Sequence, residues 1–182
     1  MAKLISATYG DALFELAVEE NKLSEMTQEI KNLQVILAQN PEFRQLLNHP
    51  HIDKEEKKEV VKNVFEGRTS GELQGFMTLI IEKDRFSEID EILTYFLEEV
   101  NRAQGIGVVY VTTAVPMTDE QKKQTEEKLL STTDYKQLEM NYDVDASLIG
   151  GMTIRIKDRI VDSSVRTKLY QLQKQLLDLQ LD

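Results

Sequence analysis

The chain has 182 residues, 41% of them hydrophobic and 30% charged, with no cysteine and a formal net charge of −10. This composition allows a globular protein with a real core and excludes disulfides and thiolate metal sites, while the acidic balance argues against nucleic-acid binding, which needs a basic surface. No apolar run reaches the ~18 residues of a membrane span, and acidic residues appear early in the first twenty residues, so we expect neither direct membrane insertion nor a signal peptide.

Two different periodicities divide the chain. Residues 1–104 follow a helical pattern from Lys3 onward and carry 12 basic and 20 acidic residues, hence a net charge of −8. From Gly105 onward apolar and polar residues alternate, because Gly105 and Gly107 interrupt the preceding helix. We therefore predict an N-terminal all-α six-helix bundle over 1–104. A small C-terminal α+β domain, with the order β-α-β-β-β-α, is predicted over 105–182.

The predicted helices of the first domain begin and end at recognisable local signals. Asn40 and Pro41 interrupt the chain after the second helix, and Asp53 with Glu56 three residues later resembles a capping box. Ser70 is a suitable N-cap for the fifth helix. The apolar stripe of the second helix, with steps of three and four residues, consists of Leu23, Met26, Ile30, Leu33 and Leu37.

The first predicted helix is apolar over a wider arc than a surface helix needs. At about 100° per residue its apolar arc covers roughly 240°, whereas a surface helix needs a stripe of about 100°. Ser6, Gly10 and Ala17 form a strip of small residues that would allow another helix to approach closely. The helix after Ser70 is similar, with Leu79 widening its apolar face. Both are either central helices of the bundle or the walls of a groove that accepts an amphipathic helix.

The second domain begins with residues 106–115, which are rich in β-branched residues and apolar on both faces, as is typical of a central strand. Thr118 and Gln121 then form a capping box in front of a very polar helix that extends to about Leu130. The remaining predicted elements are strands at 138–144, 152–156 and 160–161 and a final helix after Asp162 or Ser163.

The final helix carries an a/d seam of apolar residues. We expect its first half to pack on the sheet of its own domain, since a helix with such a seam needs a partner surface. Its last turns extend beyond so small a sheet, which leaves Leu176 and Leu179 for a partner helix. The seam, spaced by steps of four and three residues, consists of Val165, Leu169, Leu172, Leu176 and Leu179.

Three groups of residues could suggest chemistry, but none has the pattern that the chemistry requires. His49 and His51 have no further His or Cys to complete a metal site. Gly150-Gly151 is followed by a strand and not by the remainder of a P-loop, so we interpret it as a tight turn or bulge. Asp143 and Asp145 have no nucleophile or third ligand nearby. We therefore expect no catalytic residue, no metal and no cofactor.

The stretch LIGGMTIRIKDRIVDSSVRTKL, from Leu148 to Leu169, is similar to the C-terminal signature of the ATP synthase δ subunit and its mitochondrial relative, the oligomycin-sensitivity-conferring protein. Residues 8–21, 48–65 and 79–93 resemble the same family in the same order, so the resemblance spans nearly the whole chain. The residues that match the signature are Gly150, Gly151, Arg155, Asp158, Asp162, Ser164, Val165, Arg166 and Leu169. At four turn positions the chain departs from a common glycine of the family: Asp84, Lys157, Ser163 and Thr167.

This resemblance implies a non-catalytic stator protein, needed for proton-driven ATP synthesis by an F-type proton-translocating ATP synthase. The helical domain would bind the N-terminal helix of an ATP synthase α subunit on the catalytic head, in a groove between the first and fifth helices. The C-terminal domain would bind the C-terminal part of the b-type stalk subunits through its last helix. The protein would be peripheral, on the cytoplasmic side of the bacterial cell membrane. The groove residues carried over from the resemblance are Tyr9, Leu13, Leu16, Phe76, Leu79 and Ile80.

Two alternatives remain open. A cytosolic helical adaptor or regulator unrelated to the synthase would keep the bundle and the groove, but it would have no need of the C-terminal signature. A hydrolase that uses Asp143 or Asp145 would need a measurable turnover that is lost in Asp143→Asn.

Overall fold

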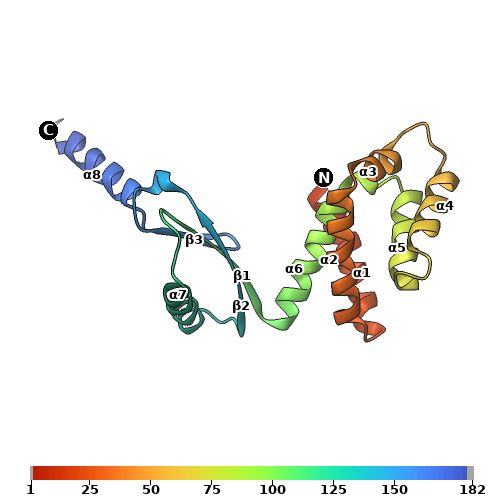
Figure 1. Ribbon diagram of the computed structural model, residues 1–182, viewed down its shortest axis with the longest axis horizontal. Coiled ribbons are helices and arrows are strands. Elements are labelled where there is room, and N and C mark those ends of the chain that lie inside the picture. The colour runs from red at the N-terminus through yellow and green to blue at the C-terminus, as the bar shows by residue number, and fades with distance from the viewer. Residues whose placement is uncertain (1, 180–182) are drawn as a thin grey trace. The chain divides into compact units, whose positions relative to one another are not determined.

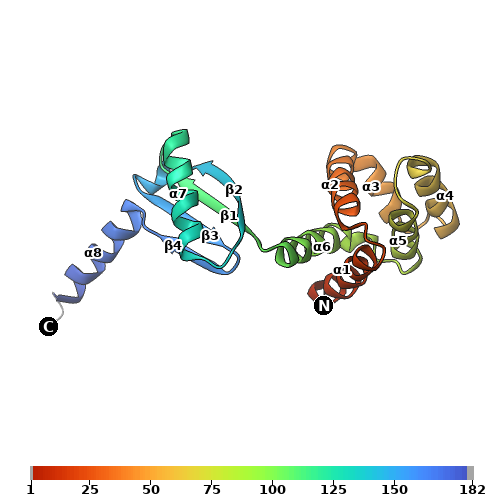
Figure 2. The same cartoon turned by 90° about the horizontal axis from the view of Figure 1, so that it is seen from below.

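The computed structural model describes residues 2–179, with side chains over 4–176 (Figures 1 and 2). The chain divides into two compact units, Met1–Val100 and Asn101–Asp182. The predicted order of a helical first part and a small α+β second part is confirmed. The boundary at 104/105 stays a prediction, because helix α6 continues past this division to Gln104. None of the described helices combines the length and the apolar character that crossing a membrane requires.

Unit 1 is helical throughout its described residues. Asn40 ends the second helix, and Pro41 opens the third at a position where the missing N–H costs nothing. The Arg44 guanidinium pairs with both carboxylate oxygens of Asp90, which ties the third helix to the first turn of the last. The elements are α1 (Ala2–Glu19), α2 (Leu23–Gln39), α3 (Pro41–Asn48), α4 (Lys54–Phe65), α5 (Gly71–Glu82), the short η1 (Phe86–Glu88) and α6 (Ile89–Gln104).

Apolar stripes from these helices meet in one core. Phe96 of α6 is fully buried and packs edge-on against Phe14 of α1, with ring centroids 6.4 Å apart. Leu23 is only half-buried and packs against the rim of the core. The rest of the predicted α2 stripe is fully buried: Met26, Ile30, Leu33 and Leu37.

Two predicted helix starts in unit 1 have different outcomes. The Ser70 hydroxyl accepts a hydrogen bond from the Leu73 N–H, so Ser70 is the N-cap of α5 as predicted. The Glu29 carboxylate of α2 accepts from both the N–H and the hydroxyl of Ser70, at 2.7 and 2.6 Å. Helix α4 does begin after Asp53, but the Asp53 side chain accepts no capping hydrogen bond, so the capping-box interpretation is wrong.

The strip of small residues on α1 is used inside the bundle. A Cβ atom at Gly10 would lie 2.4 Å from the Tyr95 ring of α6, so only glycine allows the two helices to approach this closely. Nearby, the Tyr95 hydroxyl donates to the Asp11 carboxylate at 3.0 Å. Ser6 and Ala17 are buried as well. The strip therefore serves contacts within unit 1.

Unit 2 is a four-stranded sheet in the order β2-β1-β3-β4. The pair β1–β2 is parallel, with α7 as the connection between its strands, and the pairs β1–β3 and β3–β4 are antiparallel. The elements are β1 (Ile106–Thr113), α7 (Asp119–Thr132), β2 (Gln137–Val144), the short η2 (Ala146–Leu148), β3 (Met152–Ile156), β4 (Arg159–Asp162) and α8 (Val165–Leu179).

The central strand β1 is buried on one face only. Val109 and Val111 are fully buried, whereas Tyr110 on the other face is exposed beneath the Arg155 guanidinium, which lies 4.7 Å from its ring. The strand ends at Thr113, two residues earlier than predicted, where the Thr113 hydroxyl donates to the Val115 carbonyl. The apolar residues on both faces of residues 106–115 therefore overstated how far this strand is enclosed.

Helix α7 has the start that the sequence predicts. Thr118 and Gln121 exchange both hydrogen bonds of a capping box, from the Gln121 N–H and from the Thr118 N–H. The Tyr142 hydroxyl of β2 donates to the Lys122 carbonyl of α7 at 3.3 Å, and burial raises the pKa of Tyr142. No residue of α7 is buried, so this helix covers the sheet only loosely.

Helix α8 departs from the prediction. We expected its first half to pack on the sheet, but Val165, Leu169 and Leu172 are exposed. A helix of 15 residues is about 22 Å long, whereas the edge strand β4 has four residues and spans about 13 Å. The edge strand is therefore too short to cover the helix along its length, and the seam of α8 is exposed from its first turn.

Candidate functional site

Helices α1 and α5 lie side by side in unit 1 (Figures 1 and 2). An ion pair joins them where α1 has just ended and α5 begins, with Lys22 Nζ 2.6 Å from Glu72 Oε1. This hydrogen bond raises the pKa of Lys22 and lowers the pKa of Glu72, so both groups are charged at neutral pH. The predicted groove thus has two neighbouring walls held at one end by opposite charges.

The six residues assigned to this groove fall into two sets. Leu13, Phe76 and Ile80 belong to the core, with exposed fractions of 2%, 7% and 0%. Tyr9 and Leu16 are half-buried, and Leu79 is 41% exposed. Only the second set has surface to offer a partner, so the first set can act only as the packed base beneath it.

The groove assignment missed two exposed apolar residues of α1. Leu4 and Val18 are large, apolar and exposed, one near each end of the helix. Both lie on the helix whose wide apolar arc is evident from the sequence, but neither was assigned to the groove. Val35 and Ile36 on α2 are also exposed and had no signal beyond their side-chain type.

The open seam of α8 is one exposed apolar surface of unit 2. Leu169, Leu172 and Leu176 are 53%, 56% and 64% exposed. Leu179, the other residue predicted to contact a stalk helix, lies outside the residues whose side chains are described. Exposed leucines at steps of three and four on one helix face are typical of a surface that binds another helix.

A second apolar surface of unit 2 is an open cavity of about 720 Å³ between α7 and the sheet. Ile149 on its lining has φ of +67°, a left-handed conformation that is strained for a β-branched residue. Strain of this kind is most often kept where the side chain serves a site. Its apolar lining residues include Val115, Met117, Leu129, Ile149, Met152 and Val161.

The C-terminal signature holds the start of α8, in an arrangement that we call the α8 anchor. The Asp162 carboxylate accepts hydrogen bonds from the Ser164 N–H and the Thr167 hydroxyl, at 2.9 and 2.7 Å. The buried Ser164 hydroxyl caps the helix by accepting from the Thr167 N–H. These bonds, chiefly the Ser164 N–H, lower the pKa of Asp162 to about 2.

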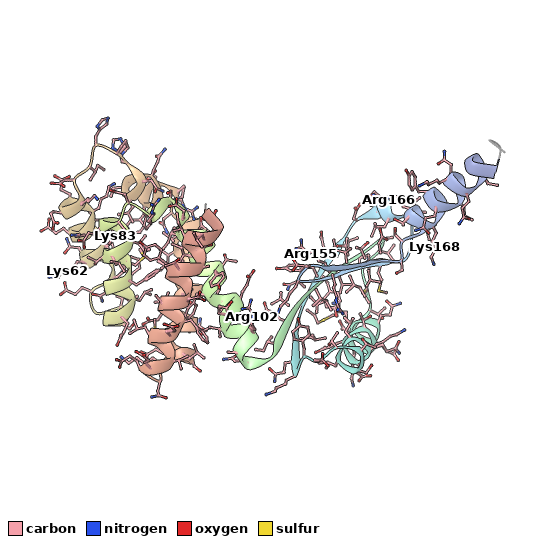
Figure 3. The ribbon with its side chains drawn as sticks, turned by 180° about the vertical axis from the view of Figure 1, so that it is seen from behind. Lys62, Lys83, Arg102, Arg155, Arg166 and Lys168 are labelled. Atoms are coloured by element: carbon pink, nitrogen blue, oxygen red, sulfur yellow. The ribbon has the colours of Figure 1, made fainter. Side chains whose placement is uncertain are left out.

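The anchor also includes the two glycines. The Val165 N–H donates to the Gly150 carbonyl at 2.9 Å, and a Cβ at Gly151 would lie 2.5 Å from the Ser163 carbonyl oxygen. Arg166, labelled at the first turn of α8 in Figure 3, donates to the Ser147 hydroxyl at 2.9 Å. The interpretation of Gly150-Gly151 as a tight turn is therefore confirmed, and Gly151 has φ of +76°.

The residues considered for chemistry are engaged in local structure. The Asp145 carboxylate accepts from the N–H and hydroxyl of Ser147, which lowers the pKa of Asp145. The Asp143 carboxylate accepts from the N–H of Val144. In the loop after α3, the His49 ring accepts from the backbone N–H of His51. Among the described residues, no group of three or more His, Asp or Glu side chains could hold a metal ion.

The decisive comparison is with protein families: residues 5–176 match the family model described as ATP synthase delta (OSCP) subunit. The chain belongs to the ATP synthase delta (OSCP) subunit family. It is 50% identical over 181 residues to an ATP synthase subunit delta of Lachnoclostridium phytofermentans, covering 100% of both chains. An ATP synthase subunit delta of Alkaliphilus oremlandii is 33% identical over 97% of each chain.

A solved structure shares the fold of this delta-family chain. A chain of the Toxoplasma gondii mitochondrial ATP synthase hexamer superposes with a TM-score of 0.76 at 20% identity, over 94% of this chain and 97% of that one. As a delta-family member, the chain is a non-catalytic subunit of the peripheral stalk of ATP synthase. It assembles with other ATP synthase subunits and associates peripherally with the membrane complex, so an unrelated adaptor is not favoured.

Proposed function

We propose that this stalk subunit couples the catalytic head of ATP synthase to the b-type stalk through two separate surfaces. Unit 1 binds the N-terminal helix of an ATP synthase α subunit, and unit 2 binds the C-terminal part of the b-type stalk subunits. The observation that carries this proposal is that each unit leaves apolar side chains exposed on helices, Leu79 in unit 1 and the seam of α8 in unit 2. Such faces are typical of sites that bind amphipathic helices.

The head contact combines an exposed rim with a packed base. Tyr9, Leu16 and Leu79 form the rim and would lose water when a partner helix binds. Burial of a leucine-sized side chain contributes about 1.5–3 kcal/mol relative to full exposure, and Leu79 starts from 41% exposure. The base residues Leu13, Phe76 and Ile80 fix the rim without contributing new buried area.

The experiment for this contact is a titration of the full chain with a peptide of the α-subunit N-terminus. Leu79→Asp should weaken binding 10- to 100-fold, because about 1.4 kcal/mol is lost per tenfold change and the carboxylate would be buried without a partner. Since Leu79 is exposed, the variant should still fold, whereas an Asp at Phe76 would disrupt the core.

The matched control is Val35→Asp on α2, where another apolar side chain is exposed outside the proposed groove. This variant should bind the peptide with unchanged affinity. Equal weakening by both variants, or no effect of Leu79→Asp, would place the α-subunit contact elsewhere on unit 1.

The subunit would be held at the cytoplasmic side of the bacterial cell membrane by these contacts. Inverted membrane vesicles should then expose the chain to added protease, and intact spheroplasts should protect it. Cleavage in spheroplasts and protection in inverted vesicles would contradict this placement.

A further inference from the structure

A lysine occupies a core position at the start of α4. Lys57 lies on the same helix face as Val61 and Phe65, at steps of four residues, and this stripe faces the core of unit 1. Lys57 is only 7% exposed. Among the described residues, its ammonium has neither a hydrogen-bond nor an ion-pair partner. Most of the Lys57 side chain is therefore buried, while its ammonium, which is not among the fully buried polar atoms that lack a partner, keeps contact with solvent.

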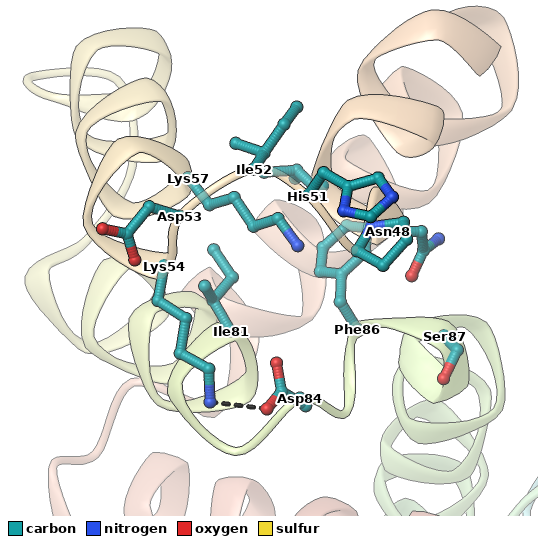
Figure 4. Close-up of a pocket in the computed structure, with 12 residues that line it drawn as sticks. Asn48, His51, Ile52, Asp53, Lys54, Lys57, Ile81, Asp84, Phe86 and Ser87 are labelled. Carbon is teal, nitrogen blue, oxygen red and sulfur yellow. Dashed lines mark ion pairs between the residues drawn. The ribbon is translucent and has the colours of Figure 1, made fainter.

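This ammonium opens onto a pocket of about 640 Å³ between the α3–α4 loop, α5 and η1. Figure 4 shows the Lys57 side chain pointing into the pocket toward His51 and Phe86. Lys54, the other cation on the lining, turns away to pair with Asp84 and donates to the Glu82 carbonyl at 2.8 Å. Lys57 is therefore the cation of the pocket that is left for a ligand.

The remaining lining restricts what that ligand can be. Ile52 is the half-buried apolar residue of the lining, and Leu47, Ile81 and Phe86 form a nearly fully buried apolar base beneath the pocket. Pockets of this kind bind ligands with an apolar body that a few polar groups orient. A compact ammonium suits a single charged oxygen group, whereas planar bidentate recognition is the property of arginine.

The charges around the pocket favour a ligand with one negative charge. Asp84 is neutralised by Lys54, but Asp53 also lines the pocket, and Figure 4 shows its carboxylate turned away from the Lys57 ammonium. Residues 1–104 together carry a net charge of −8. A dianion such as phosphate would meet more repulsion here than a monoanion, because the repulsion grows with the charge of the ligand.

We propose that this pocket binds a carboxylate carried on an apolar group, with the Lys57 ammonium as its counter-ion. The carboxylate belongs either to a free carboxylic acid or to an acidic side chain of a polypeptide. The Lys57 ammonium donates charge-assisted hydrogen bonds to it, while Ile52 contacts the apolar body. This site is separate from the exposed rim on α1 and α5 and does not depend on the proposed head contact.

The test is a titration of the isotope-labelled full chain at constant ionic strength, followed by amide chemical shifts. Hexanoate should give saturable shifts at Asn48, His51 and Ser87, and hexanamide, its neutral counterpart, should give none. N-acetylaspartate amide stands in for an acidic side chain. Tighter binding of hexanoate identifies a free acid as the source, and tighter binding of N-acetylaspartate amide identifies a polypeptide side chain.

Two variants make the test specific to the ammonium. Lys57→Met keeps the length of the side chain and should weaken hexanoate binding at least tenfold. Lys62→Met removes an exposed lysine of the same helix and should leave binding unchanged. The thermal midpoint of Lys57→Met without ligand should stay close to that of the wild type, because the ammonium of Lys57 is in contact with solvent, and an unchanged midpoint also shows that the variant folds.

Several results would overturn the proposal. Shifts that grow linearly without saturation would show that no site exists. Equal hexanoate binding by wild type and Lys57→Met would remove the ammonium from the site. Tighter binding of inorganic phosphate than of hexanoate would exclude the carboxylate class.

Discussion

Two residues of this chain hold left-handed backbone at turns where the resemblance led us to expect glycine. Asp84 has φ of +55° after α5, and Lys157 has φ of +50° in the turn between β3 and β4. Aspartate tolerates this conformation, because its short side chain can form local hydrogen bonds, whereas lysine has no such compensation. The departures from the family pattern at these two positions thus coincide with positions where glycine is favoured physically.

Lys157→Gly should therefore stabilise unit 2. The left-handed conformation costs a non-glycine residue about 1–2 kcal/mol, and the greater freedom of glycine in the unfolded chain returns about 0.5–1 kcal/mol of this. We expect the free energy of unfolding to rise by roughly 0.5–1 kcal/mol in urea titrations. Arg159→Gly, two residues later in β4, should lower it, and a loss of stability in Lys157→Gly would contradict the argument.

Asp162 should make the α8 anchor sensitive to acid. Its pKa is about 2 in the folded chain against 3.8 ordinarily, so the stabilisation is complete above about pH 5 and is lost as pH falls through 3.8 toward 2. Amide shifts of Ser164 and Thr167 should titrate with a midpoint near 2. Asp145 contributes with the same sign, so the comparison is with Asp162→Asn, in which this titration should disappear. A midpoint near 4 in wild type would show that the hydrogen bonds to Asp162 contribute nothing.

At the scale of elements, a pair of substitutions on α8 should show whether its exposed seam binds the stalk. Leu172→Asp places a charge on the exposed seam, and Gln171→Asp adds the same charge one residue away, outside the seam. If the seam binds the stalk, the first variant should weaken binding of a C-terminal b-type segment 10-fold or more, and the second should change it little. Equal effects of the two variants would show that general charge, and not the seam, governs binding.

The elements that sequence predicted well are those with local causes. The helices starting after Ser70 and Thr118 depend on side chains within three residues, and both caps are present. Asp53 has the same local pattern, but its exposed side chain accepts no capping hydrogen bond. The packing of α8 was predicted wrongly, since it depends on the length of an edge strand that pairs at a distance. The apolar periodicity of α8 carries no information about the length of β4.

In the candidate sites too, features with local causes were predictable from sequence, whereas contacts between distant residues were not. The wide apolar arc of α1 was evident from sequence, but which of its residues face α6 was not. Gly10 is used against Tyr95, and the separation of 84 residues between Asp11 and its Tyr95 partner has no local signal. Lys57 lies within the charged run KEEKKE, which carries no local signal for burial, and the structure places it in the buried stripe of α4.

At the scale of the whole molecule, the two units differ greatly in core size. Unit 1 has twenty buried apolar side chains among its described residues. Over residues 101–176, the buried apolar side chains are Val109, Val111 and Leu148. Because apolar burial is the main favourable term in folding, unit 1 should be much the more stable of the two.

The full chain should therefore unfold in two steps, which calorimetry can separate. The step at lower temperature belongs to unit 2, and a b-type stalk segment should raise only that step, since a ligand stabilises the unit that binds it. A peptide of the α-subunit N-terminus should raise only the upper step. A single transition that both ligands shift equally would show that the units fold as one.

The α8 anchor also has a mechanical consequence. A stalk subunit bears load, and force applied along α8 reaches the sheet first through the hydrogen bonds of Asp162, Ser147 and Gly150 at the first turn. With the α8 anchor intact, the helix transmits force rigidly to β3 and β4. Without the anchor, the peptide chain still joins α8 to the sheet, but the helix can rotate about this connection. Loss of the α8 anchor should therefore lower the torque that α8 transmits, because the connection to the sheet deforms. This effect should appear before the binding of any partner weakens.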